Sequence, residues 1–478
     1  MSLTAAWQQG WDPDQSAIMT PRASLDYRTL RHRMHRAIGL LTSAGVGRGD
    51  VVALMMDKEP AMVELVLAAL ACGAIVLPLN SRYTKREARF ALDDSAAVWA
   101  VLPDALAEAL SSGRTVVAAT AVRSAIDHAA EAAPPPSPPD DAPALLMYTS
   151  GTTGQPKGAL HTRSSLAAMI ESLHAAWQWS ARDRLLHALP INHVHGLVVA
   201  QLGALRAGAT AVWVDTFQAG SIAARLERGD ITVFMGVPTF YVRLLGLPAL
   251  GRSPGVRLFT SGSAPLPAAV HDAFAARTGH AIVERYGMTE IGIVCSNPLG
   301  GPRRAGSIGR PLPGVEARIA GEPGQLLIRG PSLFREYLGN PAATAAALAG
   351  GWMHTGDLGA IDEDGYVWLS GRASDLILCG GLNVYPREVE AVLAACAGVT
   401  EVAVIGVPDA DLGEVPIAVV TGDAAAETLR ESARGQLAPY KVPRRFIRVD
   451  ALPRNAMGKV VKATLRAWYG GFADGREP

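Results

Sequence analysis

Apolar segments of strand length alternate with segments of helix length along most of this chain, and this alternation limits the possible folds more than any other feature. Two helical segments, 27–41 and 59–72, each precede a short apolar run, 51–55 and 74–79. Strands separated by a helix pair in parallel through right-handed crossovers. Similar apolar runs recur at 115–119, 210–214, 231–237 and 257–261. The sequence therefore predicts an α/β fold with several sheets.

Two changes in composition suggest how the chain is divided. Residues 134–139 read PPPSPP, which cannot continue a helix or join a central strand and so predicts an extended linker. After Gly371 a compact pattern begins again, with a helix at about 386–397 and strands at 401–406 and 417–421. A chain of 478 residues is too long for one compact domain. We therefore predict a large N-terminal domain, 1–371, and a small α+β domain, 372–478.

Charge and cysteine content indicate the class of partner. The 44 basic residues balance the 44 acidic ones, which favours a small-molecule substrate over nucleic acid or an anionic membrane surface. The four cysteines are scattered, without metal-ligand spacing, as expected in a reducing cytosol. The first residues lack a secretory pattern, and the longest apolar run, 65–79, is short for a membrane span. We expect a cytoplasmic enzyme with no membrane span and no obligate protein partner.

The strongest local signal is the string YTSGTTGQPKG at 148–158. Its three glycines allow close approach of an anion, while four Ser and Thr hydroxyls and Lys157 offer hydrogen-bond donors to phosphate oxygens. Apolar residues 144–147 predict a strand just before it. Lys157 is followed by Gly158 rather than Ser or Thr, so the string is not the P-loop of nucleotide triphosphatases. A mobile surface loop of small polar residues is the alternative interpretation.

This string resembles the signature of the adenylate-forming superfamily, which includes acyl-CoA synthetases, and the resemblance extends from about residue 25 to 465. Further motifs follow in the family's order: LPINHVHG at 189–196, SGSA at 261–264, ERYGMTE at 284–290, TGD at 355–357 with GR at 371–372, and PRNAMGK at 453–459. The superfamily implies a reaction in which ATP activates a carboxylic acid as an acyl-adenylate. The acyl group then passes to a thiol, here that of coenzyme A, because no carrier domain follows the motifs.

The resemblance also assigns roles to individual residues. It implies that ATP contacts Thr149, Ser150, Gly151, Thr152, Thr153, Gly154, Lys157, Ser263, Ala264, Glu284, Tyr286, Gly287, Met288, Asp357 and Arg372. Thr289 would meet the α-phosphate, Glu290 would hold Mg²⁺, and His193 and Ser261 would line the acyl pocket, with His193 also acting in catalysis. A cation and several donors suit this chemistry because a carboxylate attacking a phosphate brings two anions together. A core or surface role for His193 and a simple turn at Ser263 are the alternatives.

Lys459 lies in the motif whose lysine, in the family, bridges the substrate carboxylate and the α-phosphate. A lysine suits this role because it carries a compact charge on a long flexible stem. The family also implies that the small domain swings after adenylation, which withdraws the lysine and admits the thiol. Many members carry Asp or Lys two residues after the motif arginine, whereas this chain has Ser374. The resemblance thus predicts the swing without identifying its pivot.

Arg285 points to the class of acid. Burying an unpaired guanidinium beside an acyl pocket is costly, and a second carboxylate on the substrate would remove that cost. The ERYGMTE and HVHG strings and residues 330–337 look like those of malonyl-CoA synthetases. We therefore expect malonate, or also methylmalonate, with Arg285 binding its distal carboxylate. Pairing of Arg285 with Glu284 or another internal acid, without a role toward the substrate, is the alternative. Residues 381–386 read more like fatty-acid or aryl-acid ligases. A CoA ligase for short- or medium-chain fatty acids or aryl acids is the alternative function, and a non-catalytic nucleotide-binding protein is a further one.

Overall fold

The structure is a computed structural model that describes residues 7–149, 156–454 and 459–470. It divides into two compact units, which are described separately. Unit 1 contains the chain up to Leu266, Val270–Glu316 and Ile328–Met353, and unit 2 contains Pro267–Ala269, Ala317–Leu327 and the chain from His354 onward. The predicted boundary at residue 371 remains a prediction. Among the described residues, no helix is both long and apolar enough to cross a membrane.

One sheet of unit 1 has seven strands in the order β18-β8-β7-β4-β3-β5-β6. Its strands are β3 (Val51–Met55), β4 (Ile75–Leu79), β5 (Trp99–Leu102), β6 (Thr115–Ala118), β7 (Pro143–Thr149), β8 (Lys157–Thr162) and β18 (Glu336–Tyr337). Strands β3 to β7 pair in parallel, and β8 pairs antiparallel with both β7 and β18. The parallel pairs follow from helical crossovers between consecutive strands. The predicted phosphate loop therefore joins two antiparallel strands, β7 and β8.

The other sheet of unit 1 has nine strands in the order β15-β14-β13-β12-β11-β9-β10-β1-β2. Its strands are β1 (Ser16–Met19), β2 (Ser24–Asp26), β9 (Arg184–His187), β10 (Thr210–Trp213), β11 (Val233–Gly236), β12 (Leu258–Ser261), β13 (Val283–Met288), β14 (Gly292–Ser296) and β15 (Arg310–Pro311). The central strands from β1 to β13 pair in parallel. Their carboxyl ends therefore lie along one edge, which is where open α/β sheets bind ligands.

Helices fill the space between and around these sheets. They are α2 (Tyr27–Ser43), α3 (Pro60–Cys72), α4 (Lys85–Asp94), α5 (Asp104–Ala107), η1 (Glu108–Leu110), α6 (Val122–His128), α7 (Arg163–Trp177), the π-helix η2 (His195–Leu202), α8 (Gly203–Arg206), α9 (Ala219–Glu227), α10 (Pro238–Leu245), α11 (Ala268–Thr278), α12 (Pro341–Ala347) and η3 (Ala349–Gly351). Twelve of the thirteen residues of α3 are buried. A helix that is apolar on every side has to be enclosed, and α3 is accordingly part of the core between the two sheets.

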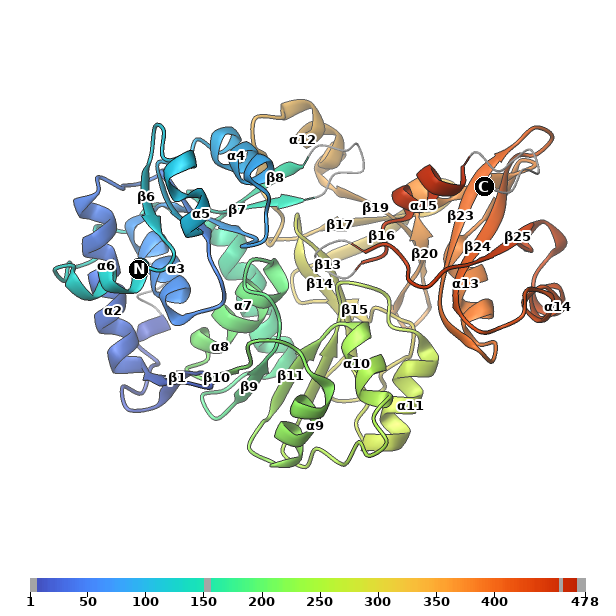
Figure 1. Ribbon diagram of the computed structural model, residues 1–478, viewed down its shortest axis with the longest axis horizontal. Helices are drawn as coiled ribbons and strands as arrows, with labels where there is room; N and C mark the ends of the chain where they lie inside the picture. Colours follow the sequence, from blue (N-terminus) through green and yellow to red (C-terminus); the bar gives the residue numbers. More distant parts are fainter. Residues whose placement is uncertain (1–6, 150–155, 455–458, 471–478) are drawn as a thin grey trace. The chain divides into compact units, whose positions relative to one another are not determined.

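Alternation along the strands determines which core each side chain enters. In β3, Val52 and Leu54 belong to the core between the sheets, whereas Val51, Ala53 and Met55 belong to the core on the opposite face. In the nine-stranded sheet, the face away from that central core is covered by α9, α10 and α11, which lie together in Figure 1. Both sheets of unit 1 are thus covered on both faces, as largely parallel sheets require.

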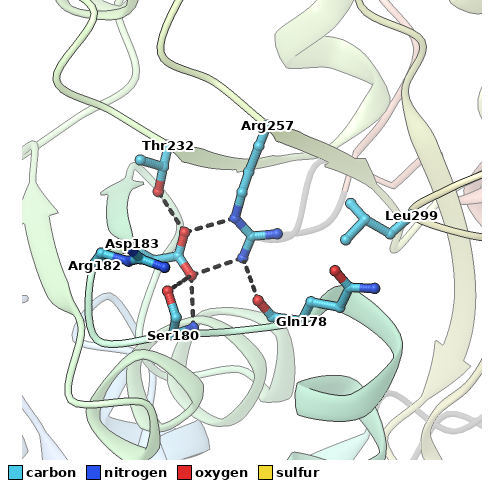
Figure 2. Close-up of a pocket in the computed structure, with 7 residues that line it drawn as sticks. All are labelled: Gln178, Ser180, Arg182, Asp183, Thr232, Arg257 and Leu299. Atoms are coloured by element: carbon cyan, nitrogen blue, oxygen red, sulfur yellow. Dashed lines mark hydrogen bonds and ion pairs between the residues drawn. The ribbon is translucent and has the colours of Figure 1, made fainter.

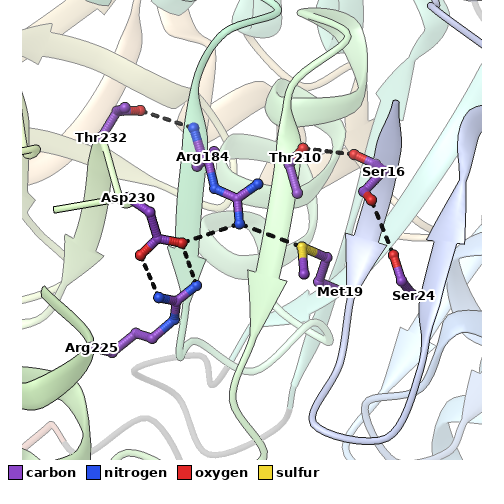
Figure 3. Close-up of polar contacts among 8 residues, drawn as sticks. All are labelled: Ser16, Met19, Ser24, Arg184, Thr210, Arg225, Asp230 and Thr232. Carbon is purple, nitrogen blue, oxygen red and sulfur yellow. Dashed lines mark hydrogen bonds and ion pairs between the residues drawn. The ribbon is translucent and has the colours of Figure 1, made fainter. Parts of the chain in front are cut away.

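Polar contacts tie the N-terminal hairpin to strands much later in the chain (Figure 3). The hydroxyl of Thr210 in β10 donates to the backbone oxygen of Ser16 in β1 over 2.7 Å. Beside them, the side chain of Arg184 in β9 donates to Asp230 over 3.2 Å, and Asp230 also pairs with Arg225 of α9. These contacts fix the amino ends of β9 and β10 and so support the carboxyl ends on the other side of the sheet.

Unit 2 has two smaller sheets. The first has the order β16-β17-β19-β20, and the second β22-β21-β24-β23 with β25 on β24. The elements are β16 (Glu316–Ala320), β17 (Gln325–Arg329), β19 (Met353–Ile361), β20 (Val367–Arg372), η4 (Ala373–Asp375), β21 (Ile377–Cys379), β22 (Leu382–Val384), α13 (Pro386–Ala394), β23 (Val399–Asp409), β24 (Gly413–Gly422), α14 (Ala426–Gln436), η5 (Pro439–Lys441), β25 (Arg445–Arg448) and α15 (Lys462–Tyr469). The second sheet and helices α13, α14 and α15 share one apolar core.

The predicted α/β fold class, with a small α+β part at the C-terminal end, is confirmed. The strand predicted at 51–55 matches β3 in both bounds, and those at 115–119, 210–214 and 257–261 correspond to β6, β10 and β12 within one residue at each end. Residues 134–139 form neither helix nor strand, as the prolines predict. The strand predicted at 401–406 is only part of β23, which is longer because it pairs along its whole length with β24.

Candidate active site

The predicted phosphate loop connects the ends of a β-hairpin. Residues Ser150, Gly151, Thr152, Thr153 and Gly154 lie outside the described residues. Thr149 and Lys157, on either side of them, are opposite each other in the β7–β8 register. The ammonium group of Lys157 lies 5.2 Å from the centre of the Tyr337 ring. This cation–π contact orients the lysine at the base of the loop.

Glu290 and Thr289 lie in the turn that joins β13 to β14. Glu290 is buried, and its Oε1 accepts a hydrogen bond of 2.8 Å from the hydroxyl of Tyr337. The backbone oxygen of Thr289 is 2.7 Å from Nε2 of His161, which donates to it. Burial lowers the pKa of His161 to about 4, so this ring is neutral near pH 7 and acts as a fixed donor. Tyr337 and His161 thereby hold both residues of the turn.

This turn can supply a magnesium ligand. Within the part of the chain that the structure describes, no three His, Cys, Asp or Glu side chains form a cluster able to hold a metal ion. Mg²⁺ is usually bound through one or two carboxylates together with substrate phosphates and water. Glu290 fits that mode, because Tyr337 occupies Oε1 and the second oxygen can bind a cation shared with a nucleotide.

Arg285 is the most unusual group of unit 1. It lies on β13, its residue is 4% exposed, and its Nε and Nη2 atoms are buried without a hydrogen-bond partner among the described residues. Burial lowers its pKa to about 9, which a nearby Tyr241 opposes only partly. The guanidinium therefore remains charged at neutral pH while its Nε and Nη2 donors lack partners among the described residues. A buried charge in this state is costly unless an anion binds to it.

Glu284 does not take the role of partner to Arg285. Its Oε1 accepts from the backbone N–H of Leu266 over 3.1 Å, and its backbone oxygen accepts from Asn297. The two residues are adjacent on β13, so their side chains point to opposite faces of the strand. The alternative in which these neighbours form an ion pair is therefore not what the structure contains.

Small residues at the end of β12 allow Arg285 to lie where it does. A Cβ atom on Gly262 would be only 2.4 Å from Cζ of the Arg285 guanidinium, so glycine leaves the space that this group fills. Ser261 is fully buried, and its hydroxyl has no hydrogen-bond partner among the described residues. Ser263 adopts a positive φ of 70°, which is rare for a residue other than glycine and is often found at functional sites. Ala264, next along the turn, is exposed.

His195, at the start of the π-helix η2, lies beside Ser263 and near Arg285. Its Nδ1 lies 3.3 Å from the hydroxyl of Ser263, and its Nε2 is buried without a partner among the described residues. Burial, with the nearby charge of Arg285, holds the pKa of His195 well below its usual value, so the ring is neutral. Buried groups without partners on Arg285, His195 and Ser261 thus lie near the carboxyl end of β12, and we call these three residues the Arg285 cluster.

His193, the histidine that the sequence favoured, is only partly buried. Its Nε2 lies 3.4 Å from the side-chain nitrogen of Asn192. Sequence reasoning therefore missed His195, although both histidines belong to the HVHG string. It also missed His161 and Tyr337, whose contacts join segments more than forty residues apart and leave no local pattern.

Three other predicted residues lie on the β13–β14 hairpin. Tyr286 is opposite Cys295 and is mostly buried, while Gly287 and Met288 are only partly covered at the end of β13. A Cβ atom on Gly287 would lie 1.9 Å from the backbone oxygen of Gly292, so the sharp hairpin requires glycine here. The role of these residues in binding a nucleotide remains a prediction.

Unit 2 contains the remaining predicted residues. Asp357 on β19 and Arg372 on β20 are opposite each other and form an ion pair of 2.8 Å between Oδ1 and Nε. The carboxylate is buried and the arginine is partly exposed. Lys459 is exposed and precedes Val460, which forms an isolated β-bridge with Arg454. The pairing of Asp357 with Arg372 fits two groups that would bind the same ribose.

A separate hollow of about 480 Å³ lies in unit 1 at the amino ends of β9, β11 and β12 (Figure 2). Asp183 accepts hydrogen bonds of 2.8 Å from both Arg257 and Thr232, so the polar groups at its centre satisfy one another. None of the residues predicted to act in the reaction lines this hollow. We interpret the Asp183 cluster as structural support at the end of the sheet opposite the Arg285 cluster.

Comparison with known protein families gives two matches that together cover most of the chain. The AMP-binding enzyme family matches residues 6–338, and the AMP-binding enzyme C-terminal domain matches residues 388–459. The mitochondrial malonate–CoA ligase of Mus musculus is 36% identical over 95% of this chain and 88% of its own length. A long-chain-fatty-acid–CoA ligase of Mycobacterium tuberculosis is 32% identical over 96% of this chain and 98% of its own length.

Solved structures agree. The crystal structure of ATP-bound MatB from Rhodopseudomonas palustris is 38% identical and superposes with a TM-score of 0.94, covering 98% of this chain and all of that one. The similarity therefore extends over both units and includes the fold as well as the sequence.

Proposed function

We propose that malonate is the acid used by this chain, which belongs to the AMP-binding enzyme family. The chain is an AMP-forming acid–thiol ligase, and this class of enzyme uses ATP and CoA. The structural observation that carries this choice is the buried guanidinium of Arg285, whose Nε and Nη2 lack partners among the described residues. One carboxylate of malonate would react, and the other would pair with Arg285 in bidentate geometry.

The size of the electrostatic effect favours a dicarboxylate. A monocarboxylic acid would place a methyl group or an aliphatic chain against the charge of Arg285 and leave its donors unsatisfied, at a cost of about 1 to 3 kcal/mol for each polar group. A distal carboxylate would instead form charge-assisted hydrogen bonds with Arg285 and lie near the neutral rings of His195 and Tyr241. The malonate–CoA ligases among the relatives support the same choice.

In the proposed reaction, a carboxylate oxygen of the acid attacks the α-phosphorus of ATP, and the bond to pyrophosphate breaks. The thiol of CoA then loses its proton, attacks the acyl carbon, and AMP leaves. Lys157 and Thr289 would donate to phosphate oxygens, Asp357 and Arg372 would hold the ribose, and Lys459 would bridge the two anions in the first step. A magnesium ion held by Glu290 would supply further neutralisation of phosphate charge.

A ligase for fatty or aryl acids is the second candidate. The relative in Mycobacterium tuberculosis, which is named for long-chain fatty acids, supports it. Activity with a panel of acids separates the two candidates, because they differ only in the acid that they use.

A cytoplasmic location is also part of the proposal. The four free cysteines are those expected in a reducing compartment.

A panel of acids tests the proposal directly. With ATP, Mg²⁺ and CoA, we expect pyrophosphate release with malonate to exceed that with butyrate, octanoate or benzoate by at least about 100-fold in kcat/KM. The reason is that a site with a buried charge discriminates strongly against substrates that cannot pair with it. Methylmalonate is expected to react as well, because its extra methyl group leaves both carboxylates in place. Faster turnover of the monoacids would disprove the malonate assignment.

Replacement of Gly262 tests the position of the guanidinium. We expect Gly262→Ala to raise the KM for malonate about 10- to 100-fold, since the new methyl group would displace Arg285 from its place. Gly220→Ala is the matched control, because a Cβ atom there meets nothing within 4 Å. Thermal unfolding would be measured for both variants. An unchanged KM for malonate in a folded Gly262→Ala protein would contradict the assigned role of Arg285.

A further inference from the structure

Lys58 is a partly buried lysine that no step of the proposed reaction uses. It follows β3 in the seven-stranded sheet, yet its ammonium group contacts the carboxyl ends of β9 and β10 in the other sheet. Nζ donates to the backbone oxygen of His187 over 2.6 Å, lies 3.2 Å from Nδ1 of the same residue and 3.5 Å from the backbone oxygen of Val214. It also lies 5.1 Å from the centre of the Trp213 ring. Every neighbour named is an acceptor or a π face.

This arrangement determines which nitrogen of His187 carries the proton. Because Lys58 supplies N–H donors, Nδ1 of His187 accepts, and the proton of the neutral ring is on Nε2. Nε2 lies 3.0 Å from the backbone oxygen of Gly196 and donates to it. Burial, together with the charge of Lys58, holds the pKa of His187 well below its usual value, so the ring has one donor and one acceptor. Gly196 is the second residue of η2.

The C-terminal end of η2 is also contacted by a residue that lies beside Lys58. The indole N–H of Trp213, whose ring lies beside Lys58, donates to the side-chain oxygen of Gln201 over 2.8 Å. Gly196 and Gln201 are both buried and lie near opposite ends of the π-helix. A π-helix has poorer internal hydrogen bonding than an α-helix and often occurs at functional sites. The position of η2 therefore depends more on hydrogen bonds from side chains outside the helix, here those of His187 and Trp213, than the position of an α-helix would.

We propose that Lys58 is a positioning residue which, through His187 and Trp213, fixes η2 and so holds the ring of His195 beside Ser263 and Arg285. Lys58 contacts none of those three residues, so its effect on them is indirect. The inference rests on the proposed function, in which the Arg285 cluster binds the distal part of the acid.

The arrangement does not require Lys58 to be charged. Burial lowers the pKa of Lys58 to about 7, which the charge of Asp215 opposes. The neutral amine still has two N–H donors, enough for the backbone oxygen and the Nδ1 of His187. The brace formed by Lys58, His187 and Trp213 therefore persists on both sides of neutral pH.

Kinetics of Lys58→Met provide the first test. Methionine has a similar length and no donors, and we expect it to raise the KM for the acid about 10- to 100-fold while the KM for ATP stays within about 2-fold. Lys85→Met, at an exposed position, is the matched control and is expected to behave as wild type. Trp213→Phe, which keeps an aromatic ring but removes the indole N–H to Gln201 and part of the buried ring volume, is expected to change the KM for the acid in the same direction by a smaller factor. Equal losses for both substrates, or no loss, would overturn the proposal.

The ring nitrogens of His187 provide a test that a merely structural role would not meet. In the full-length protein labelled with ¹⁵N-histidine, His187 is identified by comparison with His187→Asn, and we expect the wild-type ring to be protonated on Nε2. In Lys58→Met the Nδ1 signal is expected to shift because this nitrogen loses its hydrogen-bond donor, while the bond from Nε2 to Gly196 keeps the proton on Nε2. Protonation on Nδ1 in wild type would overturn the inference. This measurement needs no substrate, and the kinetics use whichever acid the wild type prefers, so a failed malonate assignment is distinguishable from a failed brace.

Discussion

Arg285→Ala is expected to lower kcat/KM for malonate by about 2 to 5 kcal/mol, which corresponds to about 30- to 5000-fold. Truncation removes the charge that would pair with the distal carboxylate and leaves that carboxylate in a pocket without a cation. Steady-state kinetics at saturating ATP and CoA would measure the change. The rate of ATP binding and the KM for ATP are expected to change little, because Arg285 lies with His195 and Ser263 in the proposed acid pocket.

Arg182→Ala is the matched control for this experiment, since Arg182 is an exposed arginine beside the hollow at the opposite end of the sheet. A second variant separates binding from stability. Arg285→Met removes the buried charge and retains apolar volume, so we expect the free energy of unfolding of the protein without substrate to rise by about 1 to 3 kcal/mol. Malonate is expected to raise the unfolding temperature of wild type and not of Arg285→Met. A destabilised variant that still responds to malonate would show that the charge serves the fold.

Lys459→Ala is expected to slow adenylation by about 100- to 1000-fold, the usual cost of removing one donor aimed at a charge that develops in a transition state. The proposed lysine acts only while the carboxylate attacks the α-phosphorus. Thioester formation from a supplied acyl-adenylate and CoA is therefore expected to be largely kept. The exchange of labelled pyrophosphate into ATP measures the first step, and release of AMP from the supplied acyl-adenylate measures the second.

Lys462→Ala is the control for Lys459, because it lies three residues further along, at the start of α15, and pairs with Glu390 over 2.7 Å. Removal of a pair of this kind costs about 1 kcal/mol of stability or less and is expected to leave both half-reactions intact. Equal losses in both half-reactions for Lys459→Ala would contradict the withdrawal of this lysine after adenylation, which the family resemblance implies.

The sequence predicted the parts of this protein that are encoded by neighbouring residues. Strand β3 and helix α3 were predicted within one residue at each end because continuous burial and helical spacing are properties of short segments. The motif at 284–290 indicated a role for Arg285 because a buried charge is costly unless a group of opposite charge pairs with it. Family membership followed from the order of several motifs and is confirmed by the family matches.

Tertiary structure alone decided which side chains meet. The contact from Tyr337 to Glu290 spans 47 positions and that from His161 to Thr289 spans 128, so neither leaves a periodic trace in the sequence. The hydrogen bond from Lys58 to His187 also joins residues far apart in the chain, from two different sheets, and no local pattern predicts it. The order of residues specifies the chemical groups and the strands that carry them. The packing of the strands determined that Nε and Nη2 of Arg285 have no partner among the described residues and that His195 lies near it, because burial and pairing depend on distances across the fold.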